Sequence, residues 1–226
     1  MKQILAILIL FQPALKANAQ SYIGISASAN SSGYTLSTPG ASLTYNYTIG
    51  WGVGIPVEIN LSEKLNLSTG LKYANKGSSL ISFTADNIAY QPKIRVNYLE
   101  IPFLIKGKFG SNKTQINPIA GFSLGYGFSG TIEDFTMDNG IRKRNVNFDN
   151  DINAFLCQFH LGVGATFNIP KGAFSFDFQY LSGINNLLKT STFPANYSLL
   201  ANGLEFTAGY LLKIGKDKST AAPLKK

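Results

Sequence analysis

Residues Ala173–Leu181 read AFSFDFQYL, an alternation of aromatic and polar side chains that few folds can accommodate. One parity is aromatic and the other is polar: Phe174, Phe176, Phe178 and Tyr180 against Ser175, Asp177 and Gln179. Because a β-strand sends successive side chains to opposite faces, this stretch predicts a strand with one aromatic face and one polar face. The fold then depends on which of the two faces meets water.

Seven further stretches follow the same two-residue period, and most are near the roughly 9–11 residues that a tilted strand needs to cross a bilayer. In chain order the eight stretches are Tyr22–Ala29, Tyr47–Asn60, Leu65–Tyr73, Val96–Phe109, Ile116–Phe128, Ala154–Phe167, Ala173–Leu181 and Gly203–Leu212. No stretch sustains a helical apolar stripe with caps, so we expect an all-β protein. Three prolines inside these stretches, Pro56, Pro102 and Pro118, each remove a ladder donor, and we expect them at bulges or strand ends.

The connections between the stretches alternate in length along the chain. The short ones are Leu61–Lys64, Gly110–Lys113 and Asn168–Gly172, and the long, polar ones are Asn30–Asn46, Asn75–Arg95, Ser129–Asn153 and Ser182–Asn202. Short turns at one rim, long loops at the other and an even strand count are typical of outer-membrane barrels. The pattern predicts an eight-stranded antiparallel up-and-down transmembrane β-barrel, with short periplasmic turns and long extracellular loops.

The apolar parity is the face that we expect to meet lipid. It carries no charge in the second to eighth stretches, whereas the polar parity is mostly Gly, Ser and Thr, with too few charges for a water-exposed surface. A soluble, lipocalin-like barrel with the apolar parity inside is the alternative. The side chains predicted to face lipid include Trp51, Phe103, Phe159, Phe174, Phe176, Phe178 and Tyr210.

The polar parity also carries a small set of charged or amide side chains that we expect inside the barrel. They are Glu58, Lys72, Glu100, Lys106, Gln158, His160, Asp177 and Glu205. Eight strands leave an interior that side chains can just fill, and buried charges must be paired or hydrogen-bonded. We interpret these residues as an interior polar network, with catalysis as the alternative.

Both ends of the chain read as separate segments. Residues 1–19 have a basic start, the apolar run Ile4–Phe11 and a small-residue site at Ala17–Ala19, which predicts a signal peptide cleaved before Gln20. The barrel is then expected over residues 20–215, followed by a basic, disordered tail over 216–226. Much of the net charge of +8 lies near this tail and forms no stripe for nucleic acid.

Two further features are candidate sites. His160 is the only histidine, and no second His, metal-spaced Cys or local serine motif accompanies it, because position 162 is Gly; we expect it to hydrogen-bond in the interior. Arg142, Lys143 and Arg144 lie in the third long connection. They either contact anionic groups such as lipopolysaccharide phosphates or belong to a solvated mixed-charge loop. We expect no catalytic site, metal or cofactor.

The segment Tyr98–Pro102 reads YLEIP, and Tyr73 is followed by Asn75-Lys76-Gly77. With Gly121 and Gly125, these residues make the chain resemble the PorT-like outer-membrane β-barrel family of Bacteroidota, often labelled porin family proteins. The resemblance implies an eight-stranded barrel in the cell outer membrane with both ends in the periplasm. The chain departs from such barrels in continuing past Tyr210 rather than ending on an aromatic residue.

These observations lead to one expected function and three alternatives. We expect a non-enzymatic outer-membrane barrel that presents extracellular loops in a structural, interaction or assembly role. Its expected partners are outer-membrane lipid and, through the loops, lipopolysaccharide or surface partners. The alternatives are a narrow pore or transporter for small solutes, an outer-membrane lipid-modifying enzyme and the secreted lipocalin-like binder.

Overall fold

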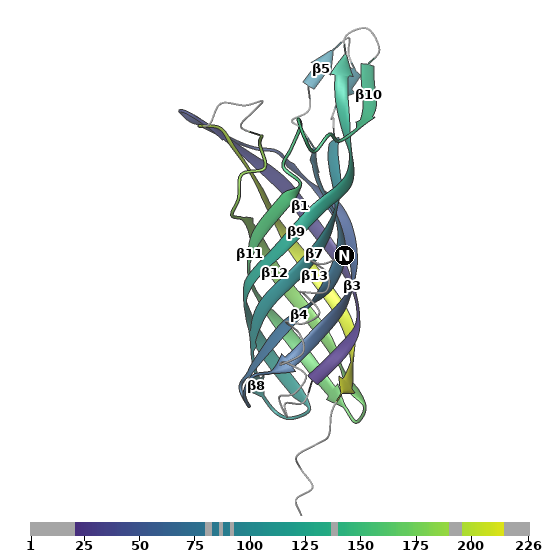
Figure 1. The fold of residues 1–226 in the computed structure, drawn as a ribbon, viewed down its shortest axis with the longest axis vertical. Coiled ribbons are helices and arrows are strands. Elements are labelled where there is room, and N and C mark those ends of the chain that lie inside the picture. Colours follow the sequence, from purple (N-terminus) through teal and green to yellow (C-terminus); the bar gives the residue numbers. More distant parts are fainter. Residues whose placement is uncertain are drawn as a thin grey trace, which may run out of the picture.

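A computed structural model describes residues 21–79, 83–85, 88–90, 93–136, 140–189 and 196–214 (Figure 1). Eight long strands form the wall: β1 (Ser21–Thr38), β3 (Asn46–Asn60), β4 (Leu65–Ser79), β7 (Lys93–Gly107), β9 (Thr114–Thr136), β11 (Phe155–Ile169), β12 (Gly172–Gly183) and β13 (Ser198–Ile214). The short strands are β2 (Ala41–Thr44), β5 (Phe83–Ala85), β6 (Ile88–Tyr90), β8 (Phe109–Gly110) and β10 (Gly140–Asn145). The predicted signal peptide (1–19) and tail (216–226) lie outside the described residues.

The eight long strands close into an antiparallel ring. Each pairs with its neighbours in chain order, and β1 closes on β13 in one register from Ser21↔Ile214 to Ser37↔Ser198. Figure 1 shows the tilted strands wound around one barrel. The predicted up-and-down barrel of eight strands is therefore confirmed. No helix in the described part of the chain is long and apolar enough to cross a membrane.

The strands extend further at the long-loop end than the alternation predicted. Strand β1 continues to Thr38 and β9 to Thr136, so the predicted loops at Asn30–Asn46 and Ser129–Asn153 are partly strand. Strands β4 and β13 likewise include parts of the predicted loops Asn75–Arg95 and Ser182–Asn202. The pairing persists because backbone N–H and C=O groups need partners whether or not the side chains alternate. The predicted long connections are therefore shorter than their predicted bounds at these ends.

The three prolines lie where a ladder is interrupted. Partners are missing between β1 and β3 around Pro56, and between β4 and β7 around Pro102. The β7–β9 ladder ends at Lys106↔Ile119, next to Pro118. Opposite Pro56, Gly70 has a φ of +138°, a conformation that favours glycine. The gaps therefore remove the need for the N–H groups that proline lacks.

The two side-chain parities occupy the two faces of the wall. The seven side chains predicted to face lipid all lie on the outer face, where Trp51 is 53% exposed and Phe178 is 50% exposed. Several form ring contacts with neighbours on adjacent strands, such as Phe103 with Phe122 at 5.3 Å between centroids. The polar parity points inward and builds the interior described next.

Candidate functional site

The barrel interior has three layers of different chemistry. At the short-turn end is an open polar basin of about 380 Å³, lined by residues such as Asn60, Asn66 and Lys108. The middle layer contains the ion pairs and a cavity of about 70 Å³. The long-loop end is filled by apolar side chains. The middle and upper layers are the candidate functional site, because the predicted interior residues meet there.

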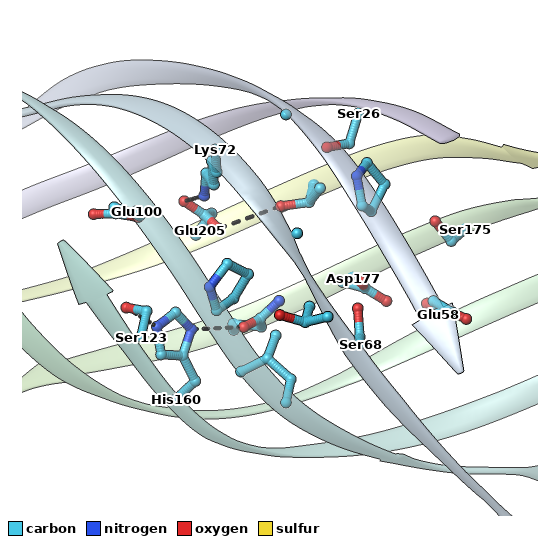
Figure 2. Close-up of a pocket in the computed structure, with 18 of the residues that line it drawn as sticks. Ser26, Glu58, Ser68, Lys72, Glu100, Ser123, His160, Ser175, Asp177 and Glu205 are labelled. Atoms are coloured by element: carbon cyan, nitrogen blue, oxygen red, sulfur yellow. Dashed lines mark hydrogen bonds and ion pairs between the residues drawn. The ribbon is translucent and has the colours of Figure 1, made fainter. Parts of the chain in front are cut away.

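Lys106 on β7 is the centre of the lower part of the middle layer. Its Nζ donates to Glu58 Oε1 at 2.8 Å and to Asp177 Oδ2 at 2.7 Å. These carboxylates come from β3 and β12 and both face the lumen (Figure 2). One lysine therefore joins three strands across the lumen. All three side chains are less than 10% exposed. Removal of Lys106 would leave two buried carboxylates without their cation.

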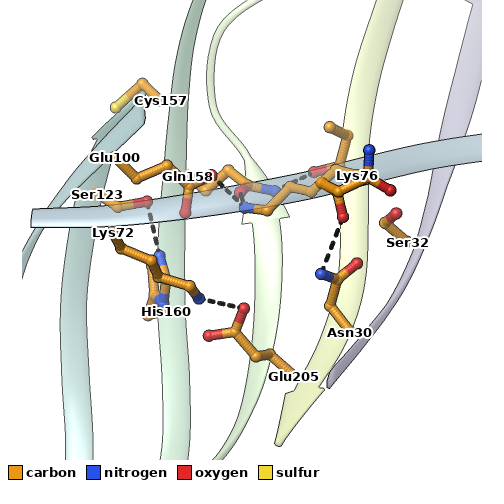
Figure 3. A network of polar contacts seen from close by, with 12 residues as sticks. Asn30, Ser32, Lys72, Lys76, Glu100, Ser123, Cys157, Gln158, His160 and Glu205 are labelled. Carbon is orange, nitrogen blue, oxygen red and sulfur yellow. Dashed lines mark hydrogen bonds and ion pairs between the residues drawn. The ribbon is translucent and has the colours of Figure 1, made fainter. Parts of the chain in front are cut away.

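Two further ion pairs form the upper part of the middle layer. Lys72 on β4 pairs with Glu205 on β13. Two inward positions further along β4, Lys76 Nζ lies 2.5 Å from Glu100 Oε1 and donates to Gln158 Oε1 at 2.5 Å (Figure 3). Gln158 Nε2 in turn donates to the Ala201 carbonyl at 2.9 Å. The predicted interior residues thus meet across the lumen as a connected layer.

Lys76 is the residue that the sequence interpretation missed. It is 2% exposed, yet it lies beyond the predicted third stretch, in what was taken as loop. The signal was present, because Lys72, Ala74, Lys76 and Ser78 continue the inward parity of β4. The charges expected inside the barrel also indicate such a residue. Among the described residues, Glu100 has no ion-pair partner other than Lys76.

His160 belongs to a hydrogen-bonded row on three adjacent strands. Its Nδ1 lies 2.9 Å from Gln179 Oε1, and its Nε2 lies 2.8 Å from Ser123 Oγ. With Nδ1 protonated, the ring donates to Gln179 and accepts the serine O–H at Nε2. No serine motif accompanies His160 locally in the sequence, but Ser123 reaches it from neighbouring β9, 37 residues away.

In nucleophilic catalysis, a serine hydrogen-bonds to a histidine, and a third polar group hydrogen-bonds to the same histidine and orients it. Here all three side chains are at most 4% exposed. The adjoining cavity of about 70 Å³ suits a few water molecules rather than an acyl chain. The geometry therefore supports hydrogen bonding in a closed interior.

The described interior carries more negative than positive groups. Glu58, Glu100, Asp177 and Glu205 face three ammonium groups, those of Lys72, Lys76 and Lys106. Asp177 Oδ1 has no hydrogen-bond partner among the described residues and lies at the cavity, where water can solvate it. In the described part of the chain, no three His, Cys, Asp or Glu side chains are grouped to hold a metal ion.

An apolar cluster, which we call the plug, fills the barrel at the long-loop end. It joins inward strand residues to residues of the connections: Tyr34, Val96, Tyr98, Val146, Ile152, Leu156, Leu187, Leu199 and Ala201. Tyr98 and Leu187 have no exposed surface, although Leu187 comes from a connection predicted to be polar. Burial of these side chains excludes water above the ion pairs. The plug closes the lumen at the long-loop end.

Arg142, Lys143 and Arg144 lie on β10, above the barrel, and all three are exposed. Arg144 forms a two-pronged ion pair with Asp151, at 2.6 and 3.1 Å. This hydrogen bonding holds the pKa of Asp151 below its usual range. Lys143 pairs across the hairpin with Glu133 in the strand register. Arg144 is therefore engaged within the loop, and Arg142 and Lys143 remain as candidate anion contacts.

Comparison with known families gives one match. The model of the family described as "Outer membrane protein beta-barrel domain" matches residues 12–189, which is most of the chain. No curated protein sequence matches.

Solved structures with a similar course of the chain are bacterial surface barrels. Ail, the attachment invasion locus protein of Yersinia pestis, is 10% identical with a TM-score of 0.38, over 86% of this chain and 99% of that chain. Neisserial surface protein A is 12% identical with a TM-score of 0.42, over 84% and 97%. OprG of Pseudomonas aeruginosa is 12% identical with a TM-score of 0.48, over 88% and 97%. These similarities imply no shared function.

Proposed function

Because the chain belongs to the outer membrane protein beta-barrel domain family, and is thus an outer-membrane β-barrel, we propose that it acts without enzymatic activity and without passing solute. Its role is in structure, interaction or assembly: the barrel holds its extracellular end in place for a partner or an assembly component. The short turns then lie in the periplasm and the long connections outside the cell.

The observation that carries this proposal is the plug above the ion pairs. A solute path through the lumen needs continuous polar space, but the polar basin ends at the Lys106 layer. Above that layer lies a cavity of only about 70 Å³, and above the cavity lies the plug. This stacking favours a closed barrel over a narrow pore. The same closure disfavours catalysis at Ser123 and His160, since substrate has no route to them.

We predict that the mature protein does not conduct ions. Refolded protein inserted in planar bilayers should give no current steps above those of protein-free membranes, because the plug interrupts the water-filled path through the lumen. Single-channel recording checks this, and a mobility shift on boiling in detergent gels verifies that the inserted protein is folded.

A wide porin recorded in the same bilayers serves as the positive control. Stable steps from the folded protein would contradict the closed barrel. The same preparation should not react at Ser123 with a fluorophosphonate probe, and labelling there would contradict the non-enzymatic role.

The loop part of the proposal concerns Arg142 and Lys143, which are exposed on β10. We predict that an Arg142→Gln/Lys143→Gln variant binds intact lipopolysaccharide about three- to fivefold more weakly at low salt, since exposed charge contacts are individually weak. The matched control is Lys113→Gln/Lys171→Gln, which removes two exposed lysines at the opposite end. Equal affinities of wild type and both variants for lipopolysaccharide would contradict a contact through Arg142 and Lys143.

The finer assignment to a PorT-like group rests on the YLEIP segment at Tyr98–Pro102. Two of its side chains have roles inside the barrel. Tyr98 packs in the plug, and Glu100 forms an ion pair with Lys76. Such roles concern the barrel interior and do not indicate what the protein does in the cell. We therefore propose the group as a structural class only.

A further inference from the structure

A connected set of polar side chains lies on the outer face of the wall, at the long-loop end of the apolar band. We call it the wall cluster, and it consists of Tyr73 and Asn75 on β4, Arg95 and Asn97 on β7, and Ser129 on β9. All five positions share the outward side with Leu71 and Leu99, which are 46% and 44% exposed. Polar groups on this face are unusual in a chain whose other outward residues are mainly apolar.

Hydrogen bonds hold the wall cluster together. Asn97 Oδ1 accepts from Tyr73 O–H at 2.9 Å and from Asn75 Nδ2 at 2.7 Å, and Asn97 Nδ2 donates to Ser129 Oγ at 2.8 Å. Arg95 Nη1 donates to Asn75 Oδ1 at 3.1 Å and to the Ile49 carbonyl at 3.2 Å. The guanidinium is thus fixed by its neighbours rather than free to sample solvent.

Two register shifts flank the wall cluster. Between Tyr47↔Ser78 and Gly52↔Ala74, β3 has one residue more than β4, and Ile49 lies in this shift. Between Asn97↔Ser129 and Tyr98↔Gly127, β9 has the extra residue Phe128. Bulges redirect side chains and are over-represented beside functional sites. Here they present the Ile49 carbonyl to Arg95 and turn Ser129 outward to Asn97.

The charge of Arg95 has no counter-charge in the described structure. No carboxylate of the described residues lies within ion-pair distance of it, and its Nη2 and Nε groups have no acceptor there. Guanidinium presents several N–H donors in a planar fork that fits phosphate with two parallel bonds. The protein therefore positions the guanidinium through Nη1, while the N–H groups of Nη2 and Nε remain as donors for an anion.

The position of the wall cluster along the barrel axis indicates the source of the anion. Tyr73 of the wall cluster is in ring contact with Trp51 and with Phe128, with centroids 5.0 and 6.1 Å apart. Trp and Tyr concentrate at the level of the lipid headgroups. Because this end of the barrel faces outside the cell, the wall cluster lies at the headgroups of the outer leaflet.

We propose that the wall cluster binds the phosphate of an outer-leaflet lipid headgroup, with Arg95 donating to the phosphate oxygens and the amides of Asn75 and Asn97 positioning Arg95. The acyl chains of that lipid lie against the aromatic side chains below. The proposal rests on the outer-membrane location of the barrel and is independent of whether the lumen is closed.

The test uses Trp51, the only tryptophan of the chain, as a reporter. It stacks on Tyr73 below Arg95, so a bound lipid changes its fluorescence. Mature protein in an uncharged detergent is titrated with lipid A, dephosphorylated lipid A or inorganic phosphate, and retained lipid is counted by native mass spectrometry. We expect saturable binding of lipid A only, weakened about tenfold or more in Arg95→Gln and partly retained in Arg95→Lys.

The matched control is Lys93→Gln, which removes an exposed charge from the same face of β7, one outward position further out. An equal loss in Lys93→Gln would overturn the proposal in favour of general charge attraction. Equal binding of dephosphorylated lipid A would overturn it as well, and saturation by inorganic phosphate alone would assign a soluble anion instead. If Arg95→Gln does not fold, as judged by heat-modifiability, unchanged affinity in Arg95→Lys would count against the two-pronged contact.

Discussion

Replacement of Lys106 by Met should destabilise the folded barrel by about 3–5 kcal/mol, because it leaves Glu58 and Asp177 as two buried carboxylates without their cation. Methionine nearly preserves the volume of the lysine stem, so the loss isolates charge from packing. Urea-induced unfolding of protein in lipid vesicles, followed by the fluorescence of Trp51, measures the free energy of unfolding.

Lys108→Met is the matched control for this change. Lys108 lies two residues further along, outside the ladder at the short-turn rim, and donates only to Asn60 Oδ1 at 3.2 Å. We expect about 1 kcal/mol or less there. The triple variant Lys106→Met/Glu58→Gln/Asp177→Asn should recover part of the loss, since it removes both stranded charges. Equal effects of Lys106→Met and Lys108→Met would contradict an interior ion-pair layer.

Replacement of Phe176 by Arg should cost about 2–4 kcal/mol, because it puts a charge on the outer face of the wall within the hydrocarbon layer. Phe176 lies between Phe167 and Phe206, with ring centroids 6.1 and 6.5 Å away. The change also removes these contacts. Unfolding in vesicles and the yield of heat-modifiable protein in the outer membrane both measure the effect.

Phe109→Arg is the comparison that tests depth. Phe109 is 60% exposed in β8, beside the short turn, where an arginine can reach the headgroups. The expected cost there is about 0–1 kcal/mol, since the penalty for a charge falls toward the interface. A similar loss of stability at both positions would show that the cost of a charge on the outer face does not depend on depth in a bilayer. That result would favour the inverted, soluble barrel.

The interior site shows what the pattern along a single strand can predict and what it cannot. Asp177, Lys106 and Glu58 could each be assigned to the inside, because parity along a strand is visible in the sequence. That they share one ion-pair group depends on the stagger of β3, β7 and β12 across the lumen. Ser123 was missed beside His160 for the same reason, since the contact is set by the register Ser123↔Gln158 and not by local spacing.

The plug could not be predicted from the alternation at all. Val146, Ile152 and Leu187 stand among polar residues, in segments where the two-residue period has ended. Single apolar residues in a polar connection are common on surfaces and carry no local signal. They become core only because the ring of strands encloses them with Tyr34, Tyr98 and Leu156.

The sequence by itself determined the class of fold, the number of wall strands and the face on which the alternating residues of the eight predicted stretches lie. It did so because the alternation of side chains has a period of two and needs no partner to be read. Only the tertiary structure decided which inward charges pair, that Lys76 is among them, that the lumen is plugged and that Arg95 is held on the outer wall. These depend on strand stagger, bulges and ring closure, which bring together residues far apart in the chain.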